Sequence, residues 1–257
     1  MEKRKDAQIY IAFHKPIDYG LWNNSLYTPV EAGAALRPVV YEGLHRDNEG
    51  VNISEWNGVY AETTVLYWIY NNVLNKEDHP KYVGFCQYRR RLEFPEDTDF
   101  DAIFKDYEVI TMEPIRLGLA PQPFYGRCHS KDDIDAAERV VKDLHPEMSV
   151  EWDKIMKLSP YLLYSNGFIL PADEFDRYCE FLFPVLEEVI SSKGWTSPET
   201  ALEKCGQEIS LGRRPRARGV GYQAQIGGFL SERLWTFWCY SQYGRRLHKN
   251  YRKFEGV

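Results

Sequence analysis

The sequence predicts an α/β fold with a mostly parallel central sheet flanked by helices. Three short apolar runs, at 8–13, 81–87 and 107–112, are rich in β-branched and aromatic residues and are typical of buried strands. Amphipathic helical patterns separate and follow these runs. Because strands that alternate with helices form parallel sheets, ligands are expected beyond the carboxyl ends of the strands. No internal repeat or linker is visible, so residues 1–257 are taken as one domain.

The elements of the first half follow in order. The run QIYIAF at 8–13 predicts a first strand that ends at His14-Lys15-Pro16. A helix is expected from Asn57, which can cap it, because apolar residues keep helical spacing as far as Leu74. The run KYVGFCQ at 81–87 lies between a His-Pro pair and three arginines and predicts a second strand.

After the third strand, apolar positions predict an amphipathic helix at 133–145, with Ser130 and Asp133 as a capping box. The segment YLLYSNGFIL at 161–170 holds two apolar stretches separated by three small residues. The helix DEFDRYCEFLF that follows should end or bend at Pro184.

The last quarter of the chain is basic. Residues 192–221 predict a mobile loop region, because glycine, proline and arginine are concentrated in GRRPRARG. A final helix is expected from Ser231, and 244–257 form a basic tail with aromatic residues. Trp235 and Trp238 keep the spacing of a buried helix face.

Composition excludes several classes of protein. The 32 basic and 38 acidic residues give a formal charge of −6, which disfavours nucleic acid as a partner. The aromatic content of 15% favours flat platforms on which sugars or bases can stack. Five cysteines without a CxxC pair indicate a reduced, cytoplasmic setting. Neither a signal peptide nor a membrane-spanning segment is predicted.

Common catalytic motifs are missing from the sequence. It has no GxGxxG, no GxxxxGK[ST] and no GxSxG, which are the motifs that usually indicate dinucleotide-binding, P-loop and α/β-hydrolase sites. The sequence therefore disfavours these three kinds of site. The six histidines and five cysteines never fall at zinc-site spacing. We therefore predict no structural metal.

The segment Gln87-Tyr88-Arg89-Arg90-Arg91 is the most unusual feature, because it follows directly on a predicted buried strand. Guanidinium groups form planar, bidentate hydrogen bonds with phosphate, so these arginines could hold a diphosphate. The alternative is a solvated network in which they pair with Glu93, Glu96 and Asp97. Local sequence leaves both interpretations open.

Several motifs occur together in one order along most of the chain. They are HKP at 14–16, DNEGVNIS at 47–54, NGVYAETTVLYWIYNN at 57–72, YVGFCQYRR at 82–90, SNGFILPADEFDRYCEFLFPVL at 165–186 and GGFLSERL at 227–234. With these motifs the chain resembles a bacterial glycosyltransferase domain first catalogued as a domain of unknown function. That domain is found in capsule, exopolysaccharide and O-antigen loci, and some of its members are galactofuranosyltransferases.

The resemblance implies a GT-A-like nucleotide-sugar-binding fold with donor contacts at several positions. His14 lies at the nucleotide, and Arg89 and Arg90 match the family's H-Y-R-R motif. Further matches are Asp47, Asn52 and Ser54 in the D-x-x-G-x-N-I-S stretch, and Glu62 and Thr63 at a helix start. Gln87 departs from the family, because it stands where a histidine is usual. Gln87 still donates and accepts hydrogen bonds at the nucleotide sugar.

The resemblance also suggests the reacting groups. Glu232 in GGFLSERL is the candidate catalytic base, with Glu62 and Asp47 as further carboxylates. The alternative for Glu232 is an ordinary acidic residue in the first turn of a helix capped by Ser231. Asn166 and Gly167 are candidates for sugar or acceptor binding, or else form a simple turn.

No cofactor is expected. Many GT-A enzymes hold a divalent cation with an Asp-x-Asp motif, and here the arginines occupy that place, so fixed cations are predicted to replace the metal. Asp97-Thr98-Asp99 has the Asp-x-Asp pattern but lies in a charged segment. A solvated loop is the favoured interpretation, with Mg²⁺ or Mn²⁺ binding as the alternative.

The predicted activity is transfer of a sugar, galactofuranose from UDP-galactofuranose with inversion, to a polysaccharide or a lipid-linked glycan. The alternatives are a transferase for a pyranosyl donor and a catalytically silent nucleotide- or carbohydrate-binding module. Peripheral contact with the anionic inner face of the cell membrane is also expected. It would use the basic residues Arg213, Arg214, Arg216, Arg218, Arg245, Arg246, Lys249, Arg252 and Lys253.

Overall fold

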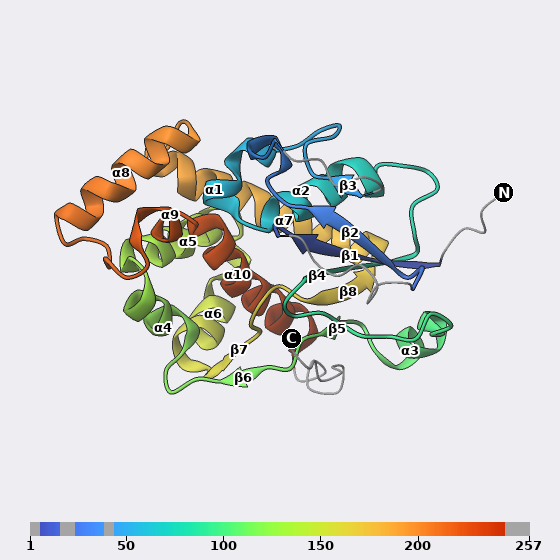
Figure 1. Ribbon diagram of the computed structural model, residues 1–257. Coiled ribbons are helices and arrows are strands. Elements are labelled where there is room, and N and C mark those ends of the chain that lie inside the picture. Colours follow the sequence, from blue (N-terminus) through green and yellow to red (C-terminus); the bar gives the residue numbers. More distant parts are fainter. Residues whose placement is uncertain (1–5, 16–23, 39–43, 245–257) are drawn as a thin grey trace.

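A computed structural model describes residues 6–15, 24–38 and 44–244 (Figure 1). Pro16 and the predicted basic tail beyond Gly244 lie outside the described residues. The contribution of that tail to membrane contact therefore stays a prediction.

The centre of the molecule is a six-stranded sheet. β1 pairs in parallel with β2 and β4, and β2 pairs in parallel with β3. Only β8 runs antiparallel to its neighbours β4 and β5. The predicted mostly parallel sheet is therefore confirmed. In spatial order the strands are β3 (His45–Arg46), β2 (Tyr27–Glu31), β1 (Ala7–Phe13), β4 (Tyr82–Gln87), β8 (Phe168–Pro171) and β5 (Ile110–Thr111).

β1 and β4 are mostly apolar because both faces of the sheet are covered. Along β1, Tyr10 and Ala12 pack into one hydrophobic cluster, while Ile9 and Ile11 pack into a second one on the other face. The first cluster joins the sheet to the long helices, and the second joins it to the segment 88–104. Alternation along a strand thus fixes which side chains face the helices.

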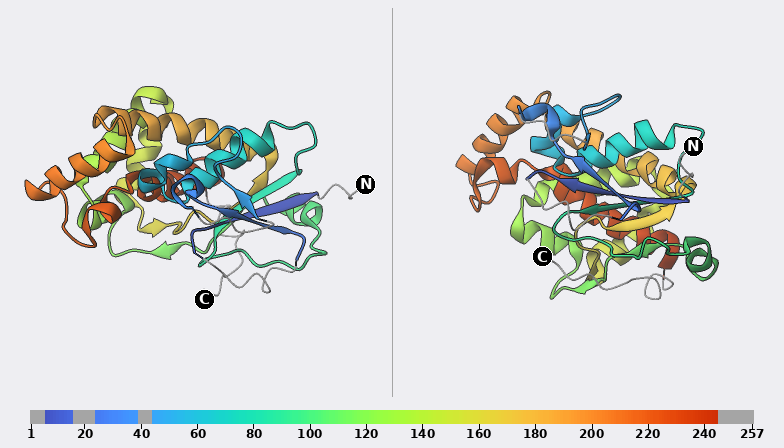
Figure 2. Two further views of the ribbon diagram at one scale, coloured as in Figure 1. Left: turned by 45° about the horizontal axis from the view of Figure 1, so that its top comes forward. Right: turned by 45° about the vertical axis from the view of Figure 1, so that its right-hand side comes forward.

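Helices surround this sheet, and Figures 1 and 2 show most of them gathered beyond one end of it, with α3 at the opposite end. A small second sheet pairs β6 (Ile115–Arg116) with β7 (Tyr161–Leu162). The α-helices are α1 (Asn57–Tyr60), α2 (Thr63–Ile69), α3 (Phe100–Asp106), α4 (Pro121–Cys128), α5 (Lys131–Leu144), α6 (Ser149–Trp152), α7 (Ala172–Ser192), α8 (Pro198–Ser210), α9 (Gly219–Gln223) and α10 (Ile226–Tyr243).

The predicted helix from Asn57 is interrupted. α1 ends at Tyr60, Ala61 adopts a positive φ of 49°, and α2 begins at Thr63 and continues as a π-helical turn at Tyr70–Leu74. Asn57 does not cap the first turn, because its amide donates instead to the Ala61 carbonyl at 2.6 Å. The interruption places Glu62 at a bend.

Three capping and loop predictions are wrong. Ser130 precedes α5 without capping it and donates to the Arg213 carbonyl, while Asp133 is buried in ion pairs. Ser231 lies inside α10, which begins five residues earlier, and donates to the Gly228 carbonyl. The segment 192–221 contains a regular helix, α8, whose first turn is closed by a Ser197 capping box.

The remaining elements agree more closely with the sequence. The third strand is limited to Ile110–Thr111, within the predicted 107–112. α7 continues through Pro184 to Ser192, so the proline does not end it. No helix in the described part of the chain is both long and apolar enough to cross a bilayer.

Candidate functional site

A cavity lies where β1 and β4 end, at the edge of the sheet where parallel folds bind ligands. It has two adjoining halves of about 250 and about 500 Å³ that share Glu62, Gln87 and Arg89. The β1 half is lined by residues that include His14, Arg37 and Tyr88. The α10 half is lined by residues that include Arg90, Tyr164, Arg218, Tyr222, Phe229 and Glu232.

Arg89 and Arg90 extend from the end of β4 into this cavity. Neither forms an ion pair with any carboxylate of the described residues. The Arg90 guanidinium lies 3.9 Å from the centroid of the Tyr164 ring, which holds it against one wall. Arg91 differs, because it pairs with Glu93 at 2.7 Å. Among the described residues, the ion-pair interpretation therefore applies to Arg91 and not to Arg89 or Arg90.

Two carboxylates of the cavity have different hydrogen-bond donors. Gln87 donates to Glu62 at 2.5 Å, and the Asn166 amide lies 3.5 Å from the same oxygen. Glu232 accepts the Ser165 backbone N–H at 3.1 Å and the Arg233 guanidinium at 2.7 Å. Glu62 thus has neutral side-chain donors, whereas Glu232 has a cationic one.

The charge of each carboxylate follows from these surroundings. Burial, together with the nearby Glu232, raises the pKa of Glu62 to about 7. Burial also raises the pKa of Glu232, but Arg233 and Arg90 act in the opposite direction. Of the two carboxylates, Glu232 is therefore the one whose ionised form nearby cations favour.

The turn between β7 and β8 supports both carboxylates. Ser165 and Asn166 have positive φ angles of 76° and 46°, a conformation that side chains other than glycine rarely adopt. This conformation directs the Ser165 N–H to Glu232 and the Asn166 amide to Ser231 Oγ at 2.7 Å. Such backbone strain is found at ligand sites, where surrounding contacts maintain it.

Asn166, Gly167 and Thr63 lie behind the cavity wall. Asn166 is buried and reaches Glu62 and Ser231. The Thr63 hydroxyl donates to Ser231 Oγ at 3.2 Å. Gly167 packs against Met112, and its carbonyl accepts the Met112 N–H at 3.1 Å. These three residues position others and are not among those that line the cavity.

Asp47 and Asn52 are not among the residues that line the cavity. The buried Asp47 carboxylate accepts four hydrogen bonds, from Gly33 N, Ala34 N, Ser54 Oγ and Thr64 Oγ1, at 2.5–2.9 Å. The Asn52 side chain bonds to its own segment, at the Gly50 carbonyl and the Ser54 N–H. In this arrangement both residues organise backbone rather than contact a ligand in the cavity.

His14 lines the β1 half and stacks edge to face against Tyr88, with ring centroids 5.3 Å apart. Partial removal from water lowers its pKa to about 4, and the cations Arg37, Arg89 and Lys15 act in the same direction. The imidazole is therefore neutral at pH 7 and can donate or accept a hydrogen bond.

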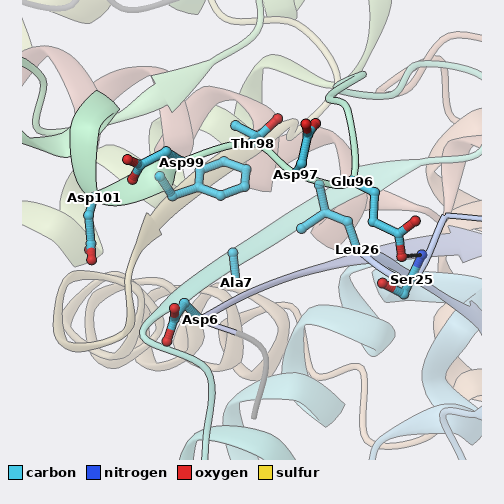
Figure 3. A pocket seen from close by; sticks show the side chains of 10 residues that line it. Asp6, Ala7, Ser25, Leu26, Glu96, Asp97, Thr98, Asp99 and Asp101 are labelled. Atoms are coloured by element: carbon cyan, nitrogen blue, oxygen red, sulfur yellow. Dashed lines mark hydrogen bonds between the residues drawn. The ribbon is translucent and has the colours of Figure 1, made fainter. Parts of the chain in front are cut away.

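The segment Asp97-Thr98-Asp99 lies at the opposite end of β1. It lines a separate acidic pocket together with Ala7, the first residue of β1, and Asp6 before it (Figure 3). Asp99 caps α3 by accepting the Ala102 N–H at 2.9 Å. At about 3.3 Å per residue, the length of β1 separates this pocket from His14 by roughly 20 Å. No group of three metal-binding side chains occurs in the described residues.

Comparison with known proteins identifies the family. The model of the Domain of unknown function (DUF4422) matches residues 8–199. The chain belongs to the DUF4422 family. A search of curated proteins gave no match.

The DUF4422 chain also resembles a solved structure, the WbbM bifunctional glycosyltransferase in its apo form. The TM-score is 0.69 at 23% sequence identity, and the match covers 97% of this chain and 44% of that one. The chain thus spans less than half the length of that protein. The likeness confirms the predicted glycosyltransferase-like fold.

Sequence reasoning missed part of the cavity of this DUF4422 chain. Arg37 precedes the undescribed residues 39–43, and no motif pointed to it. Arg218 directly precedes α9, Tyr222 lies in α9, and Phe229 lies in α10. Arg218 lies in a basic segment, and that segment predicts contact with a membrane rather than a place in the cavity.

The predicted membrane contact is wrong for Arg214. Its guanidinium is buried and bonds to Asp133 at 2.7 and 2.8 Å and to Glu208 at 2.8 Å. It therefore joins α8 to α5 and cannot meet lipid headgroups. Arg213 and Arg216 remain exposed.

Proposed function

We propose that the chain is a glycosyltransferase that binds a nucleotide diphosphate-sugar in the cavity beyond β1 and β4. The observation that carries the proposal is the pair Arg89 and Arg90, two cations at the ligand-binding edge of a parallel sheet that have no carboxylate partner among the described residues. Guanidinium groups there would stabilise the charge that develops on a leaving diphosphate. The glycosyltransferase-like fold supports the same activity.

The proposed donor is UDP-galactofuranose, and the product is formed with inversion on a polysaccharide or lipid-linked glycan of the cell surface. Motif resemblance supports this choice of sugar. His14 and Arg37 in the β1 half face the nucleotide, and Arg89 and Arg90 hold the diphosphate. A pyranosyl donor is the second candidate within the same class.

The proposed chemistry is a single displacement. Glu232 takes the proton from an acceptor hydroxyl, whose oxygen attacks the anomeric carbon. The bond from that carbon to the diphosphate breaks, and UDP leaves against the two guanidinium groups. Glu232 suits the role of base because Arg233 and Arg90 favour its ionised form. Glu62, whose pKa is raised by burial to about 7, hydrogen-bonds the donor sugar.

The reaction is proposed to need no metal, because Arg89 and Arg90 supply positive charge at the diphosphate. We also propose that the enzyme works in the cytoplasm, at the inner face of the membrane. Exposed Arg213 and Arg216 would contribute to that contact, each with about 1 kcal/mol near an anionic surface.

The proposal is tested by titrating UDP into the parent protein and three variants in a calorimeter. Arg89→Ala and Arg90→Ala are expected to weaken UDP binding at least about tenfold, because a hydrogen bond to a charged group contributes about 1.5–3 kcal/mol. Arg91→Ala is the matched control, since Arg91 already pairs with Glu93, and should bind as the parent does.

Turnover separates the remaining alternatives. With UDP-galactofuranose and UDP-galactopyranose as donors, sugar transfer or donor hydrolysis should be faster with the furanose. A protein that binds UDP but never transfers or hydrolyses either sugar would be a silent binding module. A parent that binds no UDP would contradict the proposed function.

A further inference from the structure

The α10 half of the cavity carries more positive charge than a donor diphosphate requires. Arg89, Arg90 and Arg218 all line it, and none of them forms an ion pair with a carboxylate of the described residues. The diphosphate of a nucleotide sugar offers two negative charges for Arg89 and Arg90. Glu232 is already paired with Arg233 at 2.7 Å. Within the part of the chain that the structure describes, Arg218 is then left without an anion.

Arg218 is held in an unusual backbone conformation. Its φ is 64°, in the left-handed region that non-glycine residues avoid, and it directly precedes α9. Its guanidinium donates to the Tyr222 hydroxyl at 3.1 Å and lies 4.8 Å from the centroid of that ring. A strained residue that is fixed on an aromatic ring at a cavity points to ligand binding.

The wall next to Arg218 is aromatic. Tyr222 and Phe229 are half-buried, and their ring centroids lie 4.8 Å apart. Tyr164, which is 37% exposed, lines the same half. Aromatic rings offer flat apolar surface together with a polar edge, which suits the apolar face of a sugar ring. These residues lie on the Glu232 side of the cavity, where the proposed base must meet an acceptor.

We propose that Arg218, Tyr222 and Phe229 form the acceptor half-site and that the acceptor carries an anionic group, a carboxylate or a phosphate, close to its reacting sugar. The proposal rests on the proposed function, because the donor must occupy Arg89 and Arg90. The anionic group can belong to an acidic sugar or to the diphosphate of a lipid carrier, and both would accept hydrogen bonds from the Arg218 guanidinium.

The test measures binding of two matched sugar probes to the UDP-saturated parent protein. Nitrophenyl β-D-glucuronide and nitrophenyl β-D-glucoside have similar size and differ in one carboxylate. Farnesyl diphosphate and farnesol form a second pair for the lipid-carrier source. In at least one pair the anionic member should bind about tenfold more tightly, because the free energy of one charge-assisted hydrogen bond corresponds to about a tenfold change in affinity. The pair that shows the difference identifies the source of the anion.

Variants assign this preference to Arg218. Arg218→Ala should remove it, whereas Arg216→Ala, an exposed arginine of the same segment outside the cavity, should keep it. Arg218→Gly is the second variant, because glycine adopts the left-handed conformation freely. It should keep or raise the melting temperature while it loses the preference for the anionic probe.

Equal binding of both members in both pairs would overturn the proposal, as would loss of the preference in Arg216→Ala to the same degree as in Arg218→Ala. The UDP titration keeps the two hypotheses apart. A parent that binds UDP through Arg89 but shows no anion preference retains the proposed function and loses this inference. A parent that binds glucuronide through Arg218 but no UDP loses the proposed function.

Discussion

Glu62 and Glu232 show how neighbours decide the role of a residue. Both lie in one cavity, but only Glu232 has a cationic donor in direct contact. Sequence motifs predict both carboxylates, Arg89 and Arg90 as site residues, and the structure places all four at the same cavity. The charge states could not be predicted, because they depend on Gln87, Asn166 and Arg233 as neighbours in space.

The raised pKa of Glu62 predicts a pH dependence of stability. The folded protein holds this proton up to about pH 7, against an ordinary pKa of 4.5. Its contribution to stability is therefore fully present below pH 4.5 and is lost as the pH rises through about 7. Glu62→Gln removes this loss, because glutamine stays neutral.

Urea unfolding between pH 4.5 and pH 7.5 checks this prediction. Relative to the parent, the free energy of unfolding of Glu62→Gln should rise with pH across that interval. Parallel profiles for the two proteins would show that Glu62 ionises as it does in water.

Asp47 is predicted to be a structural residue. Asp47→Asn replaces one acceptor oxygen by an amide that cannot accept, and it leaves buried donors of Gly33 or Thr64 without a partner. We expect a loss of about 2–4 kcal/mol in the free energy of unfolding. UDP affinity of the folded variant should stay unchanged. A stable variant with weakened UDP binding would restore the role that motif resemblance gave to Asp47.

Asp47, Asn52 and Gly167 show why motif positions alone do not determine the role of a residue. A polar residue or glycine in a motif can serve a ligand or the backbone around it. For Asp47 the choice depends on four donors that lie 7 to 17 residues away in sequence. Only the folded chain shows that these donors occupy both carboxylate oxygens.

At the level of elements, periodicity located strands and long helices but missed interruptions. The apolar spacing continues from Val59 to Leu74 although the helix breaks at Ala61, because both sides of the break pack into the same core. α8 was missed for a different reason. Its Ser197-Pro198 start is a good helix signal, but the glycines and arginines of 212–219 dominated the interpretation of the whole segment.

The packing of β4 between its neighbours gives a third prediction. A Cβ atom on Gly84 would lie 2.9 Å from Ile9 Cγ1 and 3.0 Å from Ile169 Cγ1, which are on the two adjacent strands. Gly84→Ala should therefore lower the free energy of unfolding by about 1–3 kcal/mol.

Gly58→Ala is the matched control for Gly84. Gly58 lies in α1 with open space at its Cβ position. Alanine there should be neutral or stabilise by up to about 1 kcal/mol. Thermal unfolding of both variants checks the pair. Equal stability of the two variants would contradict the prediction, because it would mean that the neighbouring strands shift to accommodate the new Cβ atom at Gly84 without a loss of stability.

For the molecule as a whole, strand direction separates two charged regions. The carboxyl ends of β1 and β4 meet the arginine-lined cavity, and the amino end of β1 meets the acidic pocket with Asp97 and Asp99. The sequence predicted the parallel sheet and hence the edge at which ligands bind. It could not place α9 and α10 across that edge, because their position depends on packing of distant helices.

This separation predicts that a chelator leaves catalysis intact. The Asp-x-Asp segment lies at the other end of β1 from Arg89 and Arg90. Turnover of the proposed donor in excess EDTA should therefore equal turnover in Mn²⁺ or Mg²⁺. A rate that falls with EDTA and returns with either cation would show that arginines do not replace the metal.

The most direct test of the central claim is a crystal structure of the protein with UDP bound. We expect both phosphates within hydrogen-bond distance of the Arg89 and Arg90 guanidinium groups, with the nucleoside in the β1 half beside His14. A diphosphate bound elsewhere, for example on a cation in the acidic pocket at Asp97 and Asp99, would contradict the account.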